Sequence, residues 1–299
     1  MSNSVRLCEV GPRDGLQNEP ETLSVAQRAA FITALAQAGH KHIECGAFVR
    51  AASIPQMADT AAVLAALPPL PGVALTALVP NLEGMEAALA AGCKSVAVFT
   101  ATSESFSRKN TNANVAESMQ RIEQVAARCR SSGTQLRGYV STVLHCPLEG
   151  RTDPARAVAI AERLRALGCA EISFGETTGK ATPAEVRVLC QLIQAAGLMD
   201  CSALHFHDTF GMGIANALVA YEAGARSFDS SAGGLGGCPN APGAAGNVAT
   251  EDLLHLFAGL GVSTGVDLAL QVRAGQVVAA ALGRALPGRA WRALIQSPR

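Results

Sequence analysis

The chain has 299 residues, of which 49% are hydrophobic and 16% charged, enough to form one large globular domain or two ordinary ones. Its 24 Lys and Arg balance its 24 Asp and Glu, so no net charge would attract nucleic acid or an anionic membrane. No apolar run reaches the roughly 18 to 20 residues that span a bilayer, and the N-terminus does not read as a secretory signal. We therefore expect neither nucleic acid nor membrane as a partner.

The nine cysteines are spread along the chain without a CxxC pair or a regular spacing. A protein of this size does not need disulfides to be stable, so the pattern is typical of reduced thiols. We expect a cytoplasmic location.

Short β-type segments alternate along the chain with alanine-rich segments of helical spacing. The predicted strands are Val5–Val10, His42–Cys45, Leu75–Val79, Ser95–Thr100, Gln135–Val143, Glu171–Phe174, Ala203–His207 and Arg226–Ser230. The predicted helices include Val25–Ala38, Leu82–Ala91, Val115–Ser131, Pro154–Leu167, Pro183–Ala196 and Ile214–Ala223. Many of these helices are followed by glycine, which ends a helix readily.

Eight strands that alternate with helices predict a single α/β domain, a (β/α)8 TIM barrel over about residues 5–264. An open doubly wound sheet is the alternative, but "GPRDG" after the first strand is not the GxGxxG of a dinucleotide site. Residues 265–299 form a C-terminal extension. It contains an extra helix at about Val266–Leu282 and a loosely held tail, Pro287–Arg299.

Active sites of such barrels lie where strands end, and polar residues at the strand ends indicate a metal site. His205 and His207 are two apart in a strand and face the same side, whereas Phe206 faces the other. Asp14 would add a carboxylate oxygen and Asn247 an amide oxygen, a set that suits Mg²⁺ or Mn²⁺ better than structural zinc. The alternative is that the two histidines are ordinary core or surface residues.

The segment "GGLGGCPNAPGAAGN" follows the last strand and has Cys238 near its centre. One interpretation is a flexible loop without further function. The other is a mobile lid that carries a reactive thiol over the substrate. The remaining cysteines are expected to be buried small side chains.

Three motifs, "EVGPRDGLQNE", "HFHDTFG" and "GGLGGCPNAPGAAGNVATEDL", together resemble the 3-hydroxy-3-methylglutaryl-CoA (HMG-CoA) lyase family. The likeness runs from Val5 to about Asp267. The resemblance implies a metal-dependent TIM-barrel lyase that cleaves HMG-CoA to acetyl-CoA and acetoacetate, as in leucine degradation and ketone body formation. It also implies a homodimer and an acyl-CoA substrate.

The family's site residues fall on named positions of this sequence. Its metal ligands match Asp14, His205, His207 and Asn247. Its catalytic arginine matches Arg13, which would stabilise the developing enolate. Its active-site cysteine matches Cys238, which would protonate the carbanion, and its strand-end glutamate and first-loop glutamine match Glu44 and Gln17. The base that takes the hydroxyl proton is either His205 or a metal-bound water.

Three segments depart from the family pattern, one of them the fifth strand, which continues here as Tyr139–Cys146. After the second strand the chain has Glu44-Cys45-Gly46-Ala47-Phe48 in place of a hydroxyl-rich run. At the end of the sixth strand it has Glu176 in place of aspartate, and Lys180 follows. These changes are either neutral or reshape the acyl pocket, which would favour a related substrate such as citramalyl-CoA or a longer-branched 3-hydroxyglutaryl-CoA.

Three further points stay open in the sequence. Arg108 and Lys109 are candidates for the phosphates of CoA, although an ordinary solvated basic pair explains them as well. A condensing enzyme that uses acetyl-CoA is a possible relative, but such enzymes carry a larger C-terminal region. A non-catalytic binding protein would have little reason to keep Arg13, Asp14 and the two histidines together.

Overall fold

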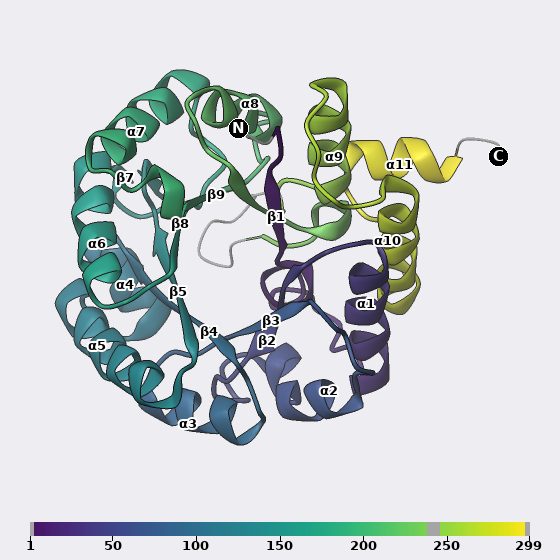
Figure 1. Cartoon of the computed structure of the whole chain (residues 1–299), viewed down its shortest axis with the longest axis horizontal. Coiled ribbons are helices and arrows are strands. Elements are labelled where there is room, and N and C mark those ends of the chain that lie inside the picture. The colour runs from purple at the N-terminus through teal and green to yellow at the C-terminus, as the bar shows by residue number, and fades with distance from the viewer. Residues whose placement is uncertain (1–2, 238–245, 297–299) are drawn as a thin grey trace.

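The structure is a computed structural model that describes residues 3–237 and 246–296. Eight parallel strands close into a barrel in the order β1-β10-β9-β8-β5-β4-β3-β2, with helices around the outside (Figure 1). The predicted (β/α)8 TIM barrel is therefore confirmed, and the open sheet is excluded. Parallel strands put all their carboxyl ends on one side, so the residues that follow them gather at one mouth.

All eight predicted strands are present within a few residues of their expected bounds. The barrel strands are β1 (Arg6–Glu9), β2 (His42–Ala47), β3 (Ala74–Leu78), β4 (Ser95–Ala101), β5 (Gln135–Ser141), β8 (Glu171–Glu176), β9 (Ser202–Phe206) and β10 (Ser227–Ser230). A short antiparallel hairpin, β6 (His145–Cys146) and β7 (Gly150–Arg151), follows β5. It was not predicted, because two residues a strand leave no periodicity to detect.

The helices between the strands agree equally well with the sequence. The predicted ones are α1 (Val25–Gln37), α3 (Leu82–Ala90), α5 (Val115–Ser132), α6 (Pro154–Ala166), α7 (Pro183–Ala195), α8 (Gly213–Glu222) and α10 (Leu268–Leu282). Sequence reading missed α2 (Thr60–Ala66), α4 (Glu104–Thr111), α9 (Thr250–Gly259) and α11 (Arg289–Gln296). Helices α2 and α4 are only seven and eight residues long, which is about two turns and leaves little room for an apolar stripe. Helix α11 is equally short, but Trp291, Leu294 and Ile295 follow helical spacing, so its signal was present in the sequence.

The outer sides of the strands and the inner sides of the helices form one continuous apolar layer. Ile43, Val96, Ile172 and Leu204 of the strands are fully buried in it, as is Phe31 of α1. The glycine that ends α1 has a second role. Gly39 has a φ of +108°, and a Cβ there would overlap the carbonyl oxygen of Gly265, so glycine lets the C-terminal segment approach α1.

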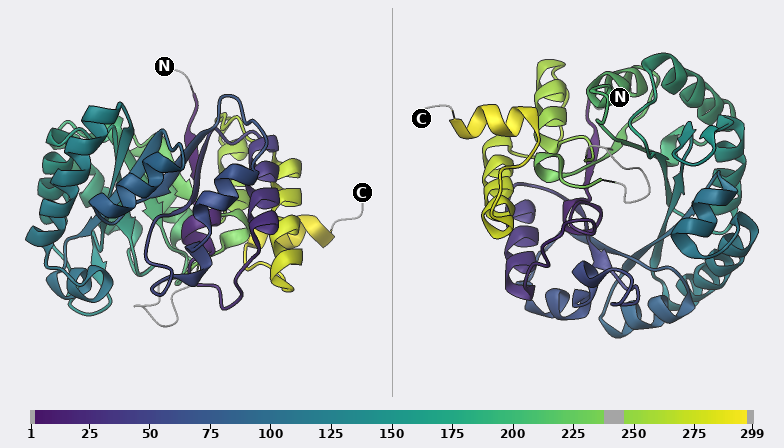
Figure 2. Two further views of the ribbon diagram at one scale, coloured as in Figure 1. Left: turned by 90° about the horizontal axis from the view of Figure 1, so that it is seen from below. Right: turned by 180° about the vertical axis from the view of Figure 1, so that it is seen from behind.

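The described part of the C-terminal extension is anchored to the barrel, which corrects the expectation of a loosely held tail for residues 287–296; residues 297–299 lie outside the described residues. Helix α10 lies beside α1, and α11 follows it on the same side of the barrel (Figure 2). Trp291 of α11 is 3% exposed, and its Nε1 donates to the carbonyl of Val272 at 3.1 Å. A Cβ at Gly275 would overlap the indole ring. One large aromatic residue thus holds α11 against α10.

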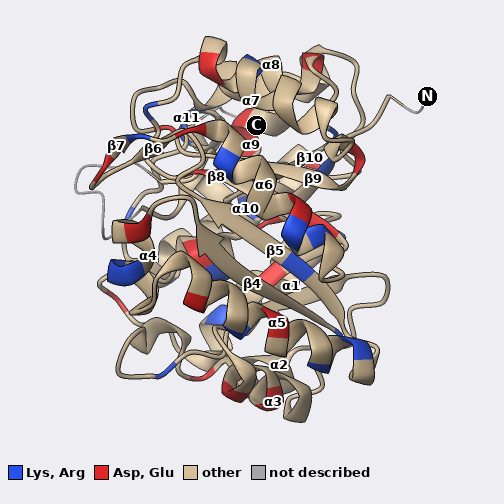
Figure 3. Cartoon of the chain, turned by 90° about the vertical axis from the view of Figure 1, so that its left-hand side faces the viewer, with Lys and Arg blue, Asp and Glu red and all other residues tan. Residues whose placement is uncertain are grey.

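The outer surface carries both signs of charge. Acidic and basic residues are interspersed along the helices on the side drawn in Figure 3, in line with the equal totals of the sequence. Across the described ranges, none of the helices combines the length and the apolar character needed to cross a bilayer.

The packing of Trp291 predicts a large effect of its removal on stability. Trp291→Ala should lower the free energy of unfolding by about 3–5 kcal/mol, because a buried aromatic side chain is lost and a cavity is left. Chemical denaturation measures this directly. Arg292→Ala, at the exposed neighbouring position of the same helix, should change it by less than about 0.5 kcal/mol. Equal stability of Trp291→Ala and the parent would contradict the packing of α11.

Candidate active site

The turn after β1 brings Arg13 and Asp14 to the mouth of the barrel. Gly11–Gly15 (η1) form one turn of π-helix, in which the N–H groups of Gly15 and Leu16 donate to the carbonyls of Val10 and Gly11 at 3.1 and 3.0 Å. Such turns are frequent at functional sites. Arg13 is buried although it directly follows a strand end. The break in the strand pattern at "GPRDG" therefore marks a compact turn, which directs the side chains of Arg13 and Asp14 into the barrel mouth.

Asp14, His205 and His207 form a cluster that could hold a metal ion. One potential ligand atom from each lies within 4.8 Å of the others. The two imidazoles face the same side at the end of β9, and Phe206 between them is buried in the apolar layer on the other side. The alternation expected from the sequence is confirmed.

The fourth expected ligand, Asn247, lies beside Asp14. Its Nδ2 donates to Asp14 Oδ2 at 2.9 Å and to the carbonyl of Leu235 at 3.0 Å. Its Oδ1 and the Nδ1 of His207 are buried and have no hydrogen-bond partner within the described part of the chain. Unpaired buried acceptors are costly unless a ligand satisfies them. A carboxylate, an amide oxygen and two imidazoles therefore fit a divalent cation that accepts oxygen ligands.

The surroundings keep His207 and Asp14 in the protonation states that bind metal ions. Burial, together with neighbouring His205, lowers the pKa of His207 to about 4, so His207 is neutral near pH 7. Burial alone would raise the pKa of Asp14, but Arg13 and the two histidines outweigh it and lower that pKa. Neutral imidazole and ionised carboxylate are the forms that bind metals.

Arg13 is held between two carboxylates. Its Nε donates to Glu44 Oε2 and its NH1 to Asp14 Oδ1, both at 2.7 Å. Burial by itself would lower the pKa of Arg13, but Glu44 and Asp14 raise it, so the guanidinium stays charged. Gln17 supports the pair: its Nε2 donates to Asp14 Oδ1 at 3.0 Å. Arg13, Glu44 and Gln17 are thus brought together with the cluster, as the motifs suggested.

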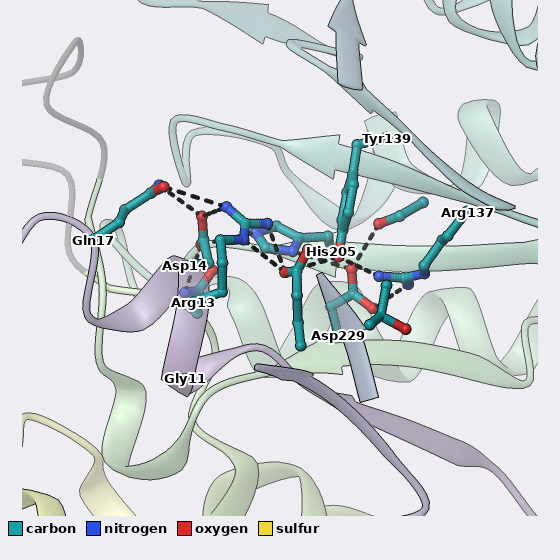
Figure 4. Close-up of polar contacts among 12 residues, drawn as sticks. Gly11, Arg13, Asp14, Gln17, Arg137, Tyr139, His205 and Asp229 are labelled. Atoms are coloured by element: carbon teal, nitrogen blue, oxygen red, sulfur yellow. Dashed lines mark hydrogen bonds and ion pairs between the residues drawn. The ribbon is translucent and has the colours of Figure 1, made fainter. Parts of the chain in front are cut away.

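A second layer of charged residues lies below the cluster inside the barrel (Figure 4). Asp229 of β10 accepts from Arg137 NH2 at 2.5 Å and from Ser173 Oγ at 2.7 Å, and its Oδ2 lies 3.3 Å from His205 Nδ1. Burial opposes ionisation of Asp229, but the Arg137 guanidinium lowers its pKa. A carboxylate on Nδ1 leaves Nε2 of His205 facing Asp14, 3.9 Å from its Oδ2.

Tyr139 joins the two layers. Its ring faces the guanidinium carbons of Arg13 and Arg137, at 5.5 and 4.7 Å from the ring centre. Its hydroxyl donates to Glu44 Oε2 at 3.2 Å and accepts from Arg137 NH1. Sequence reasoning missed Tyr139, Arg137 and Asp229. The available signal was their spacing, because Arg137, Tyr139 and Ser141 alternate along β5 and so share the inner face.

A cavity of about 790 Å³ opens from this cluster toward α4. Its inner end is lined by Arg13, Asp14, Gln17, Tyr139, Ser141, Thr177, His205 and His207. Its walls are apolar at Val49, Ile54, Leu78, Pro80, Phe99 and Phe106, and its outer end carries Arg50, Lys109, Asn110, Asn112 and Arg121. A lining that combines cationic and polar side chains with an apolar wall suits a ligand that has both anionic and apolar parts.

Three residues expected to bind substrate are placed elsewhere. Arg108 is exposed on α4 and does not line the cavity, whereas its neighbour Lys109 does. Glu176 is fully buried and accepts from the Thr178 hydroxyl at 2.8 Å. Lys180 is exposed. Neither Glu176 nor Lys180 lines the cavity. Cys238 lies outside the described residues, directly after Gly237, which lines the cavity.

Fold and cluster together define a class of protein: a TIM barrel with a cation-binding set of side chains and a deep cavity at its carboxyl-terminal mouth. The family model described as HMGL-like matches residues 4–278. The chain belongs to the HMGL-like family.

Individual relatives agree over nearly the full length. The chain is 51% identical to the hydroxymethylglutaryl-CoA lyase of Pseudomonas mevalonii, with 97% of each chain covered. It is 45% identical to the 3-hydroxy-3-isohexenylglutaryl-CoA/hydroxy-methylglutaryl-CoA lyase of Pseudomonas aeruginosa, covering 99% of this chain and 98% of that one. The crystal structure of hydroxymethylglutaryl-CoA lyase from Pseudomonas aeruginosa superimposes with a TM-score of 0.96 at 45% identity, covering 99% and 98% of the two chains.

The cluster predicts that the purified protein binds Mn²⁺ and that Asp14→Asn or His207→Ala weakens this binding. The loss should exceed the roughly 10–100-fold that removal of an outer-shell partner costs, because a direct ligand is removed. Electron paramagnetic resonance of free Mn²⁺ measures the dissociation constant.

Glu176→Gln is a matched control, since Glu176 is a buried carboxylate at the end of a barrel strand but outside the cluster. It should bind Mn²⁺ as the parent does. The assignment fails if Asp14→Asn and the parent have the same affinity.

Proposed function

We propose that this protein is a divalent-metal-dependent carbon–carbon lyase that cleaves HMG-CoA to acetyl-CoA and acetoacetate. The observation that carries the proposal is the contact of Arg13 with Asp14 inside the cavity. This contact places the Arg13 guanidinium beside the cluster that could hold a metal ion. The names of the relatives support the same reaction.

Asp14, His205, His207 and Asn247 would hold Mg²⁺ or Mn²⁺. When bound, the ion would act as a Lewis acid that orients and acidifies the C3 hydroxyl of the substrate. In the reaction the C2–C3 bond breaks, the hydroxyl loses its proton and C3 becomes a ketone. The electron pair of the broken bond passes to C2 and is delocalised onto the thioester oxygen as an enolate.

Arg13 is proposed to stabilise that enolate oxygen. Its charge is secured by Glu44 and Asp14, and its position is fixed by hydrogen bonds at 2.7 Å to each of them. A pre-positioned cation in a site with little water lowers the barrier, because no reorganisation is needed as charge develops. Glu44 and Gln17 then act by holding Arg13 and Asp14.

His205 is a candidate for the base that takes the hydroxyl proton in an arrangement where its Nε2 does not bind the ion, because Nδ1 faces Asp229 and only Nε2 has a free lone pair. Burial disfavours its charged form, but the hydrogen bond and charge of Asp229 outweigh this and raise its pKa. The alternative base is a water on the metal. Cys238 is proposed, on the motif alone, to return a proton to C2 and so give acetyl-CoA.

The outer end of the cavity is proposed to hold the phosphates of CoA. Lys109, expected from the sequence to bind the phosphates, lines the cavity there together with Arg50 and Arg121. Arg108 would act only at the surface. Guanidinium and ammonium groups are suitable partners for phosphate, and the apolar wall between the ends would contact the pantetheine chain.

A larger substituent at C3 defines a second candidate substrate. Leu78, Pro80 and Phe99 offer an apolar wall to the cavity, and one relative is named for an isohexenyl substrate as well as for HMG-CoA. The same cleavage steps would serve both. Comparing kcat/KM for the two compounds decides which is preferred.

A homodimer and a cytoplasmic location stay predictions. Light scattering coupled to size-exclusion chromatography would measure the mass of the assembly against the 30.7 kDa of one chain.

Activity should depend on a divalent metal. Treatment with a chelator should abolish cleavage of HMG-CoA, and added Mg²⁺ or Mn²⁺ should restore it, because the cluster needs the ion to act on the hydroxyl. Release of acetoacetate measures turnover. A panel that includes citramalyl-CoA, and an assay for condensation with acetyl-CoA, separates the other reactions. Full turnover by metal-free protein would overturn the proposal.

Arg13→Gln should lower kcat by about a hundredfold or more, with a smaller change in KM, since an interaction made mainly in the transition state is lost. The control is Arg50→Gln at the outer end of the same cavity, which should mainly raise KM. If Arg13→Gln raises KM and leaves kcat unchanged, Arg13 serves in substrate binding instead.

Cys238→Ser should bind substrate but turn over slowly, because a hydroxyl is a much weaker acid than a thiol. Mn²⁺ affinity should be unchanged, since sulfur is not among the proposed ligands. Cys201→Ser, at a partly exposed cysteine outside the cavity, is the control and should keep full activity. A Cys238→Ser variant as active as the parent would remove this assignment.

A further inference from the structure

Glu9 is a fully buried carboxylate at the end of β1, outside the cavity. A buried carboxylate is unfavourable unless hydrogen-bond donors surround it. Glu9 has three: its Oε1 accepts from the backbone N–H groups of Gly11 at 2.8 Å and Ala232 at 2.9 Å, and its Oε2 accepts from the Thr250 hydroxyl at 2.7 Å. None of the reaction steps proposed above uses this side chain.

The three donors belong to three separate segments of the chain. Gly11 begins η1, the turn that carries Asp14. Ala232 begins η4 (Ala232–Gly234), which leads to Leu235, whose carbonyl accepts from Asn247. Thr250 begins α9, three residues after Asn247. Glu9 is thus bonded to the segment of Asp14 and to both segments that flank Asn247.

The fit around Glu9 is close. A Cβ at Gly11 would lie 2.6 Å from Glu9 Oε1, so the carboxylate would have to move to admit a side chain there. A second set of buried groups holds the same region from behind: His40 Nε2 is 2.9 Å from Gln271 Oε1, and Gln271 Nε2 donates to Glu251 at 3.3 Å. Glu251 accepts in turn from the N–H of Gly233 in η4 at 2.7 Å.

We propose that Glu9 is a positioning residue for the metal site: its carboxylate sets Asp14 and Asn247 at the spacing that a divalent cation needs. Without it, the two backbone N–H groups of Gly11 and Ala232 would be buried without partners, and both segments would shift to find others. The inference rests on the metal site under Proposed function, but Glu9 itself does not touch the ion.

The test measures Mn²⁺ affinity by electron paramagnetic resonance, without substrate and therefore independently of lyase activity. Glu9→Ala should weaken binding by about 10–100-fold, the range for loss of an outer-shell partner. Glu9→Gln should stay close to the parent. Its amide oxygen can accept from both N–H groups, and its NH2 can donate to Thr250 Oγ1, which lies 2.8 Å from Ser230 Oγ and can donate there.

Burial raises the pKa of Glu9 to about 7, so a neutral glutamine is close in charge to the protonated carboxyl. Thr250→Val keeps the shape of the side chain but removes one donor, and it should weaken Mn²⁺ binding less than Glu9→Ala. This variant also serves if Glu9→Ala does not fold.

Asn216→Ala is the matched control. Asn216 is fully buried in α8, and its Nδ2 donates to the carbonyl of Ala181 at 2.9 Å, which belongs to neither η1 nor η4. Its loss should leave Mn²⁺ affinity unchanged. The proposal is overturned if folded Glu9→Ala binds Mn²⁺ like the parent, if Asn216→Ala weakens binding equally, or if Glu9→Gln is as weak as Glu9→Ala. A parent protein that binds no Mn²⁺ would instead refute the metal site.

Discussion

The contact between Asp229 and Arg137 fixes the interior of the barrel, because a carboxylate with 2% exposure would not stay ionised there without a cation beside it. Asp229 orients His205, and Arg137 contacts Tyr139, which bonds to Glu44. Glu44 in turn holds Arg13, and Arg13 holds Asp14. Each charged group on this path meets an opposite charge or a hydroxyl. The residues at the mouth of the barrel are therefore positioned by contacts that begin at Asp229 and Arg137 in its interior.

Much of this arrangement could be predicted from the sequence, and the parts that could not have physical reasons. Strand ends located Asp14 and the two histidines, because all parallel strands of a barrel end at one mouth. Asp229 lies 92 residues from Arg137 and 24 residues from His205 in sequence. No local pattern therefore marks these residues as partners. Helix α11 is likewise held through Trp291 by a contact with α10 that only the folded chain contains.

Glu176 illustrates a different limit of motif comparison. Its departure from the family pattern suggested a change in the substrate pocket. In the structure Gly175 and Thr177 line the cavity, and by the two-residue period of an extended chain the side chain between them faces away. Glu176 is accordingly bonded to Thr178. A substitution next to a pocket residue in sequence is thus not a substitution in the pocket.

The hydrogen bond between Asn247 and Asp14 joins residues 233 positions apart. During synthesis the segment of Asp14 leaves the ribosome before the other barrel strands, whereas Asn247 follows only after the last of them. Domains fold as units once their contacts can form, and late long-range pairing is slow. Nascent chains would therefore lack the complete donor set until the barrel closes between β1 and β10. Only a chain with a complete barrel would then bind the ion. A chain whose synthesis stopped early would not bind it.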